Sequence, residues 1–103
     1  MKVELIDKMG TDLSVVNAAR VSYAKEKEEF EESDERLIRY LAEHKHWSPF
    51  AHTFLSFRIK APVFVARQLV KHQVGLVWNE ESRRYITYDP EIYNIRKWRK
   101  KPD

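Results

Sequence analysis

Two groups of polar residues in the second half of the chain could together bind a phosphorylated ligand. The first group combines cations, amides and an imidazole: Arg67, Gln68, Lys71, His72 and Gln73. The second group, in the run 78–85, mixes acids and a hydroxyl with two guanidinium groups. Guanidinium groups bind phosphate through paired hydrogen bonds, and a nearby carboxylate can orient them or accept from a base or sugar. Together the groups predict a nucleotide site whose chemistry belongs to an organic cofactor. An exposed, solvated helix face is the alternative for the first group.

The four histidines could in principle bind a metal ion. They are His44, His46, His52 and His72. His44 and His46 are two residues apart, and no His-Glu-x-x-His pattern accompanies them. Hydrogen bonding to the backbone or to a ligand is therefore favoured, and no metal site is predicted.

Length and composition limit the class of protein. The chain has 103 residues, of which 43% are hydrophobic and 34% charged, which predicts a single domain over 1–103 with a modest core. The absence of cysteine excludes a thiolate nucleophile. No apolar run of about 18 residues and no signal-peptide core occur, so we expect a cytoplasmic protein without a membrane partner. With only two glycines, the chain lacks glycine-rich phosphate loops.

Charge is distributed unevenly along the chain. Residues 1–50 carry 8 basic and 11 acidic side chains, a net charge of −3, whereas residues 51–103 carry 11 basic and 5 acidic ones, a net charge of +6. This asymmetry favours an anionic partner for the second half, such as a nucleic acid, a nucleotide or a phosphorylated cofactor. A solvated basic face is the alternative, above all for the terminal run 96–101.

Hydrophobic periodicity predicts an α+β chain with short strands and three helices. A charged stretch, 25–32, is expected to be a solvated loop without chemistry, and 44–52 a polar and aromatic loop. The predicted elements are a strand over 2–7, a helix from Thr11 or Asp12 to about Val21, a helix capped by Ser33 and ending near His44, a half-buried strand over 53–60, a helix beginning at Pro62, and a strand over 82–88.

The third predicted helix has one apolar and one polar face. At about 100° per residue, its apolar side chains from Val63 to Val70 share a broad arc, and Arg67, Gln68, Lys71 and His72 lie on the other side. Arg67 and Lys71 would be like charges four residues apart, which is unfavourable by a few tenths of a kcal/mol. An anion bound between them would relieve that repulsion.

The same segment, 67–85, resembles the signature of the flavin-dependent thymidylate synthases. That signature is arginine-histidine-arginine, seven residues and serine, within a longer Asn-Glu-x-Ser-x-Arg-Tyr pattern. The segments 18–22, 46–52 and 60–68 resemble family segments in the same order, so the similarity spans nearly the whole chain. The expected fold is that of the N-terminal, signature-bearing half of this family.

The chain departs from the family pattern at several positions. Lys71 and Gln73 stand where the signature has two arginines, and eight residues rather than seven separate Gln73 from Ser82. Lysine lacks the planar fork of arginine, and glutamine lacks its charge. Ala51 falls where the family often has an acid, and the Lys-His-x-Val-Gly sequence resembles viral members.

The resemblance implies reductive methylation of dUMP to dTMP. FAD would be the cofactor, and NADPH and methylenetetrahydrofolate the co-substrates, in the cytoplasm or, for a viral protein, the host cytoplasm. This route needs no enzyme nucleophile, which agrees with the lack of cysteine. The lack of cysteine also excludes the thymidylate synthases whose mechanism requires a thiolate.

The resemblance also assigns binding roles, and no catalytic residue is assigned within the chain. Ser82 would bind the substrate rather than attack it. The residues expected at FAD are Ser22, His46, Ser48, Lys71, His72, Gln73 and Glu80. The residues expected at dUMP are Gln68, Lys71, Glu80, Glu81, Ser82, Arg83 and Arg84.

Members of this family are about twice as long and share their sites among the subunits of a homotetramer. Their second half supplies further FAD contacts and a dUMP-binding arginine, so we expect further sequence or a second polypeptide to supply that half here. Two other functions stay open: a non-catalytic flavin- or nucleotide-binding remnant, and a small basic nucleic-acid-binding protein with Trp98 in its terminal basic run.

Overall fold

A computed structural model of the chain describes residues 1–101. The chain forms two compact units, residues 2–59 and the residues from Lys60 onward together with Met1. The single domain expected over 1–103 stays a prediction. In the part of the chain described, no helix is both long and apolar enough to cross a membrane.

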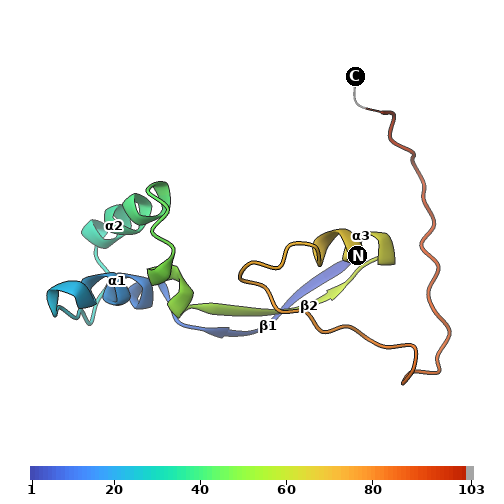
Figure 1. The fold of residues 1–103 in the computed structure, drawn as a ribbon, viewed down its shortest axis with the longest axis horizontal. Coiled ribbons are helices and arrows are strands. Elements are labelled where there is room, and N and C mark those ends of the chain that lie inside the picture. Colours follow the sequence, from blue (N-terminus) through green and yellow to red (C-terminus); the bar gives the residue numbers. More distant parts are fainter. Residues whose placement is uncertain (102–103) are drawn as a thin grey trace. The chain divides into compact units, whose positions relative to one another are not determined.

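The first unit contains both strands and helices, with all its helices between the two strands in chain order, which confirms the α+β class. Its two strands, β1 and β2, pair in a two-stranded sheet and run in opposite directions (Figure 1). Two α-helices and two short 3₁₀ helices, η1 and η2, connect them. The elements in chain order are β1 Lys2–Met9, α1 Asp12–Arg20, η1 Val21–Tyr23, α2 Glu32–Glu43, η2 Ser48–His52 and β2 Phe54–Lys60.

The sheet is more exposed than the alternating pattern of its second strand predicts. Phe57 and Ile59 of β2 remain 49% and 40% exposed, so the prediction of a half-buried strand is wrong. Within this unit, α1 packs against α2, η1 and η2, which leaves the sheet without a helical layer from its own unit. A two-stranded sheet without such a layer cannot bury either face.

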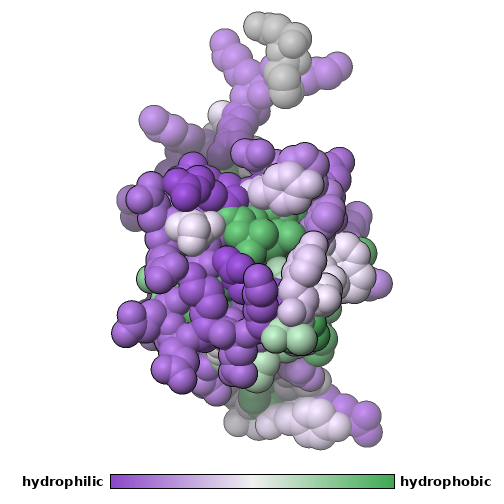
Figure 2. Space-filling view, turned by 90° about the vertical axis from the view of Figure 1, so that its left-hand side faces the viewer, coloured by the Kyte–Doolittle hydropathy of each residue, from purple (hydrophilic) through white to green (hydrophobic). Residues whose placement is uncertain are grey.

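The core of the first unit is small and lies between the helices. Its buried apolar residues are Val15 and Val16 of α1, Leu41 of α2 and Pro49 of η2. Hydrophilic side chains cover most of the face seen in Figure 2, and hydrophobic side chains show near its centre and toward its edges. With so small a core, polar contacts must contribute a large share of the stability.

Both α-helices begin with the same kind of cap, in which the backbone N–H of the residue before the helix donates to the side chain of the third helical residue. Thr11 precedes α1 as predicted, and its backbone N–H donates to Ser14 Oγ at 3.0 Å. α2 begins at Glu32, so the predicted Ser33 cap is wrong. The reason is Asp34, whose carboxylate accepts the backbone N–H of Glu31 at 2.9 Å and so caps the helix two residues earlier.

The second unit contains one short helix, α3 Val63–Leu69, which follows Pro62. Its start agrees with the prediction, but Lys71 and His72 lie beyond its end. The backbone N–H of His72 donates to the carbonyl of Leu69 at 3.1 Å, a tight turn that ends the helical course. The prediction that Arg67 and Lys71 lie four residues apart on one helix is therefore wrong.

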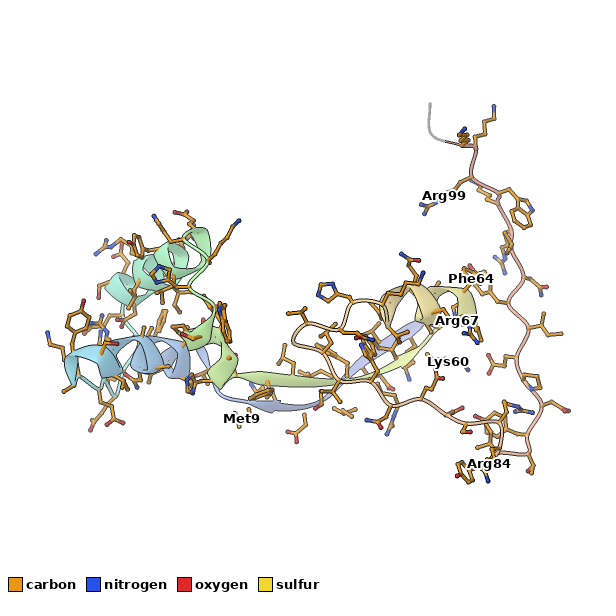
Figure 3. All side chains as sticks on the ribbon, viewed as in Figure 1. Met9, Lys60, Phe64, Arg67, Arg84 and Arg99 are labelled. Atoms are coloured by element: carbon orange, nitrogen blue, oxygen red, sulfur yellow. The ribbon has the colours of Figure 1, made fainter. Side chains whose placement is uncertain are left out.

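Residues 70–101 contain no helix or strand (Figure 1). The predicted strand over 82–88 is wrong, because the carbonyl of Ser82 accepts the N–H groups of Tyr85 and Ile86, at 2.9 and 3.3 Å, in a turn. Two contacts hold the segment around residue 92: an ion pair from Lys60 Nζ to Glu91 Oε1 at 2.5 Å, and an edge-on contact of Phe64 with Tyr93 at 5.6 Å (Figure 3). The first lowers the pKa of Glu91 through its hydrogen bond.

Substitution of Gly10, between β1 and α1, is expected to destabilise the fold more than substitution of Gly75. Both have a positive φ, +85° and +73°, which disfavours any side chain. A Cβ on Gly10 would also lie 2.9 Å from Thr53 Cγ2 and 3.2 Å from the carbonyl oxygen of His52, whereas a Cβ on Gly75 meets nothing within 4 Å. We expect Gly10→Ala to lower the free energy of unfolding by about 3 kcal/mol and Gly75→Ala by about 1 kcal/mol in urea titrations. Equal losses would contradict the close approach at Gly10.

Candidate functional site

A surface pocket of about 360 Å³ in the first unit joins three of the residues expected at the flavin. Ser22, His46 and Ser48 come from different elements and line the same pocket. All three side chains are exposed, so a ligand could reach them directly. The complete lining is Ala18, Ala19, Ser22, Leu41, Lys45, His46, Trp47, Ser48 and Pro49.

A Schellman motif at the end of α2 positions His46. The backbone N–H of His46 donates to the carbonyl of Leu41 at 2.8 Å, and that of Lys45 donates to the carbonyl of Ala42 at 3.1 Å. Lys45, between the last helical turn and His46, has a φ of +57°. This motif folds the chain back over the last turn, so that His46 and Leu41 line the same pocket.

Aromatic contacts surround the His46 ring. Its centroid lies 6.1 Å from that of Tyr40 in an edge-on arrangement. Tyr40 stacks on His44 with centroids 4.0 Å apart, and His44 Nδ1 lies 2.9 Å from the Tyr40 carbonyl oxygen. His44 therefore makes the backbone hydrogen bond that was favoured over metal binding. Edge-on and stacked ring contacts restrict the orientation of the imidazole at the pocket.

A buried ion cluster joins the end of α1, which precedes Ser22, to the start of α2. Asp34 is fully buried, although the acidic residues next to it in the sequence, such as Glu32 and Glu35, are exposed. Arg20 Nη2 lies 2.7 Å from Asp34 Oδ1, and Lys27 Nζ lies 2.5 Å from Asp34 Oδ2. The hydrogen bond from Lys27, followed by those from the Glu31 backbone and from Arg20, lowers the pKa of Asp34 to about 2. The same bond raises the pKa of Lys27.

The charged stretch 25–32 is an exposed loop over most of its length, as predicted, but Lys27 is partly buried and bonded to both α-helices. Besides the ion pair of its ammonium, Lys27 bonds through its backbone to the side chain of Asn17. Its N–H donates to Asn17 Oδ1, and its carbonyl accepts from Asn17 Nδ2, both at 2.9 Å. The sequence carries only a weak signal for this arrangement. Asp34 lies within the charged run 25–35, where its residue type does not distinguish it from its exposed acidic neighbours.

The remaining candidate residues lie in the second unit, on and after α3. Gln68 is exposed on α3, and Lys71, His72 and Gln73 follow the helix. The indole Nε1 of Trp78 donates to the His72 carbonyl at 3.3 Å, which closes the loop between them. These residues thus share one loop region with Glu80, but they lie in a different unit from the pocket.

The two guanidinium groups of the signature segment differ in their contacts. Arg83 Nη1 donates to the Tyr88 carbonyl at 2.5 Å, and its guanidinium lies 5.8 Å from the Tyr88 ring centroid. The Tyr88 hydroxyl donates to Glu81, and this hydrogen bond raises the pKa of Tyr88. Arg83 and Glu81 are thus both engaged within the turn.

Arg84 keeps its side-chain donors available. Its guanidinium lies over the ring of Tyr85, 5.8 Å from the centroid, and within residues 1–101 it has no carboxylate partner. Its backbone N–H lies 3.3 Å from Ser82 Oγ, so the serine hydroxyl takes part in the turn. In Figure 3, Arg84 extends from the loop that follows α3. Of the two guanidinium groups, Arg84 is the one free to bind an anion.

The donor set of the pocket fits a flavin nucleotide. Two hydroxyls and an ammonium suit phosphate oxygens, and an indole and an imidazole suit a planar ring system. Sequence reasoning missed Lys45 and Trp47 as lining residues. Trp47 lies between two residues that were identified, so adjacency could have indicated it, whereas a lysine beyond a helix end carries no such signal.

The model of the Thy1 family, which is described as "thymidylate synthase complementing protein", matches residues 4–103 of the chain. The chain belongs to the Thy1 family. Flavin-dependent thymidylate synthases are among its Thy1 relatives: that of Thermotoga neapolitana is 50% identical over 91 residues, which cover 88% of this chain and 41% of the relative. The enzyme of Kosmotoga olearia is 48% identical over 91 residues, which cover 88% of this chain and 39% of that enzyme.

Solved structures of Thy1-like proteins agree with the fold. A UMP/dUMP methylase, PolB from Streptomyces cacaoi, bound with 5-Br dUMP, matches with a TM-score of 0.73 and 45% identity. The match covers 84% of this chain and 37% of PolB. The chain thus spans about two fifths of the length of these three proteins. The expected family resemblance and fold class are confirmed.

Proposed function

We propose that the protein is a flavin-dependent thymidylate synthase, which methylates dUMP to dTMP with methylenetetrahydrofolate as the carbon donor and NADPH as the reductant. The observation that carries the proposal is the pocket that brings together Ser22, His46 and Ser48, three residues that the family resemblance assigns to FAD. Membership of the Thy1 family supports it. The use of these small-molecule substrates agrees with a cytoplasmic location.

The first unit would hold the flavin. FAD, when bound, would accept electrons from NADPH and supply them for reduction of the transferred carbon. The hydroxyls of Ser22 and Ser48 would donate hydrogen bonds to it, and His46, held by its aromatic neighbours, would contact it from the end of α2. The ion cluster on Asp34 would keep the residues before and after Ser22 in place.

The second unit would bind the substrate and further parts of the cofactor. The free guanidinium of Arg84 is suited to the dUMP phosphate. Ser82 would act as a binding group, because its hydroxyl already interacts with the backbone of the turn and no base lies in contact with it among residues 1–101. The remaining proposed substrate residues are Gln68, Lys71, Glu80, Glu81 and Arg83, and those proposed at FAD are Lys71, His72, Gln73 and Glu80.

The site would be completed by other polypeptide segments. A pocket of about 360 Å³ with exposed side chains is too small and too open to enclose FAD. We therefore propose that further sequence or a second polypeptide closes it within a homotetramer.

An absorption spectrum of the purified full-length protein, with and without dUMP, tests the proposal. We expect flavin bands that remain after removal of free FAD and shift when dUMP is added. dTMP should form when methylenetetrahydrofolate and NADPH are supplied. A protein that retains no flavin would refute the proposal, and one that retains flavin but forms no dTMP would be the non-catalytic remnant.

A further inference from the structure

Lys45 occupies a backbone position that favours glycine. It is the residue after the helix cap in the Schellman motif of α2, and its φ is +57°. A side chain is unfavourable there because Cβ crowds the neighbouring carbonyl oxygen, whereas glycine is not affected. Within residues 1–101, Ala24 is the only other non-glycine residue with a positive φ. A lysine at such a position calls for a role of its side chain that outweighs the backbone cost.

The surroundings of Lys45 provide such a role. Lys45 lines the pocket with Ser22, His46 and Ser48, and no carboxylate is among the lining residues. In the described part of the chain, its ammonium forms no ion pair, in contrast to the paired Lys27. Lys45 is therefore the one permanently charged group of the pocket lining, and its charge is available to an anion.

We propose that Lys45 binds a phosphate group of the flavin nucleotide in this pocket. A lysine ammonium is a compact charge that commonly binds phosphate, and the hydroxyls of Ser22 and Ser48 provide further donors. The proposal rests on the proposed function and adds a residue that the family resemblance does not assign. It also explains why the end of α2 carries a lysine at the expense of backbone stability.

The substitution Lys45→Gly separates the two effects of this residue, because it should relieve the unfavourable backbone conformation and weaken FAD binding. In the full-length protein we expect the melting temperature to stay equal or rise, since glycine adopts the positive φ without crowding. We expect the dissociation constant of FAD, measured by flavin fluorescence, to increase about 10-fold. Riboflavin, which lacks phosphate, should bind both proteins equally.

Two further variants separate charge from backbone geometry. Lys45→Gln keeps a side chain at the strained position but lacks the charge, so it should lose FAD affinity as Lys45→Gly does, without the gain in melting temperature. Lys45→Arg should retain most of the affinity. Added salt should weaken FAD binding more in the wild type than in Lys45→Gly, because it screens the ammonium.

Three results would overturn the inference. If Lys45→Gly binds FAD as tightly as the wild type, Lys45 has no phosphate role, and the proposed function stands. If riboflavin and FAD lose affinity equally, the side chain contacts the ring system and not the phosphate. A wild-type protein that binds neither flavin would refute the proposed function itself, and the inference with it.

Discussion

Asp34→Ala is expected to lower the melting temperature of the protein by more than about 10 °C, or to abolish cooperative unfolding. The carboxylate is fully buried and accepts hydrogen bonds from Arg20, Lys27 and the backbone of Glu31. Its removal leaves the partly buried Arg20 guanidinium and the Glu31 backbone N–H without their acceptor, and leaves Lys27 with the exposed carboxylate of Glu31 alone. Breaking one member of a buried pair is strongly destabilising, because the remaining charge is uncompensated. Arg20 Nε already lacks a partner among residues 1–101, so the loss of Asp34 would remove the hydrogen bond of Nη2 from the same guanidinium.

Glu35→Ala is the matched control for this substitution. Glu35 follows Asp34 in the same helical turn and pairs with Arg39 at 2.7 Å, but both side chains are more than half exposed. Exposed pairs of this kind contribute about 0.3–0.5 kcal/mol, so the melting temperature should fall by less than about 4 °C. Thermal unfolding followed by circular dichroism measures both variants. Similar shifts would show that the cluster is not a main source of stability.

The acid sensitivity of the protein should depend on the same carboxyl group. The pKa of Asp34 is lowered from 3.8 to about 2, chiefly by the hydrogen bond from Lys27. A group whose pKa is lower in the folded state stabilises the fold at pH values above its unfolded pKa, and this contribution disappears as the pH falls through the folded value. The wild type should therefore lose stability between about pH 4 and pH 2, and Asp34→Ala should lose less over that interval.

Arg84→Ala is expected to weaken dUMP binding about 10- to 100-fold. Arg84 carries the guanidinium that has no acceptor within the turn, whereas Arg83 is bound to the Tyr88 carbonyl. A charged hydrogen bond to phosphate contributes about 1.5–3 kcal/mol, which corresponds to that loss. Calorimetric titration with dUMP measures the effect, and deoxyuridine, which lacks the phosphate, should bind the wild type and the variant alike.

Arg99→Ala removes the same chemical group from the terminal basic run (Figure 3). Because this run lies outside the signature segment, the substitution should change the dissociation constant of dUMP by less than about 2-fold. Equal losses in the two variants would show that the phosphate site is misplaced. If Arg99→Ala instead reduced a salt-sensitive affinity for DNA or RNA, the basic run would have a nucleic-acid role of its own.

Elements determined by local patterns were predictable from the sequence. The strand near the N-terminus, the helix after Thr11 and the strand ending at Lys60 form within two residues of their expected bounds. Alternation and helical spacing depend on near neighbours, so they are visible in the sequence itself. The order of motifs was likewise sufficient for the family, which the match over residues 4–103 confirms. The roles assigned to individual site residues stay predictions.

Elements that depend on a distant partner were not predictable. The segment after Ser82 has the alternation of a strand but forms a turn, because hydrogen bonds to the Ser82 carbonyl replace the pairing that a strand requires. Ser33 has the residue type of a helix cap, yet the backbone N–H of Glu31 donates the capping hydrogen bond to the Asp34 carboxylate. Residue type alone does not say which of two competing hydrogen bonds will form.

By itself, the sequence determined the family, the α+β class, the lack of thiolate chemistry and the set of candidate binding residues, since residue types and short spacings carry that information. The tertiary structure alone decided which acid is buried, that Ser22, His46 and Ser48 share one pocket, and that Lys45 joins them. The physical reason is that burial and convergence depend on chain segments that are distant in sequence. Asp34 resembles its exposed acidic neighbours until Arg20, fourteen positions earlier, folds onto it.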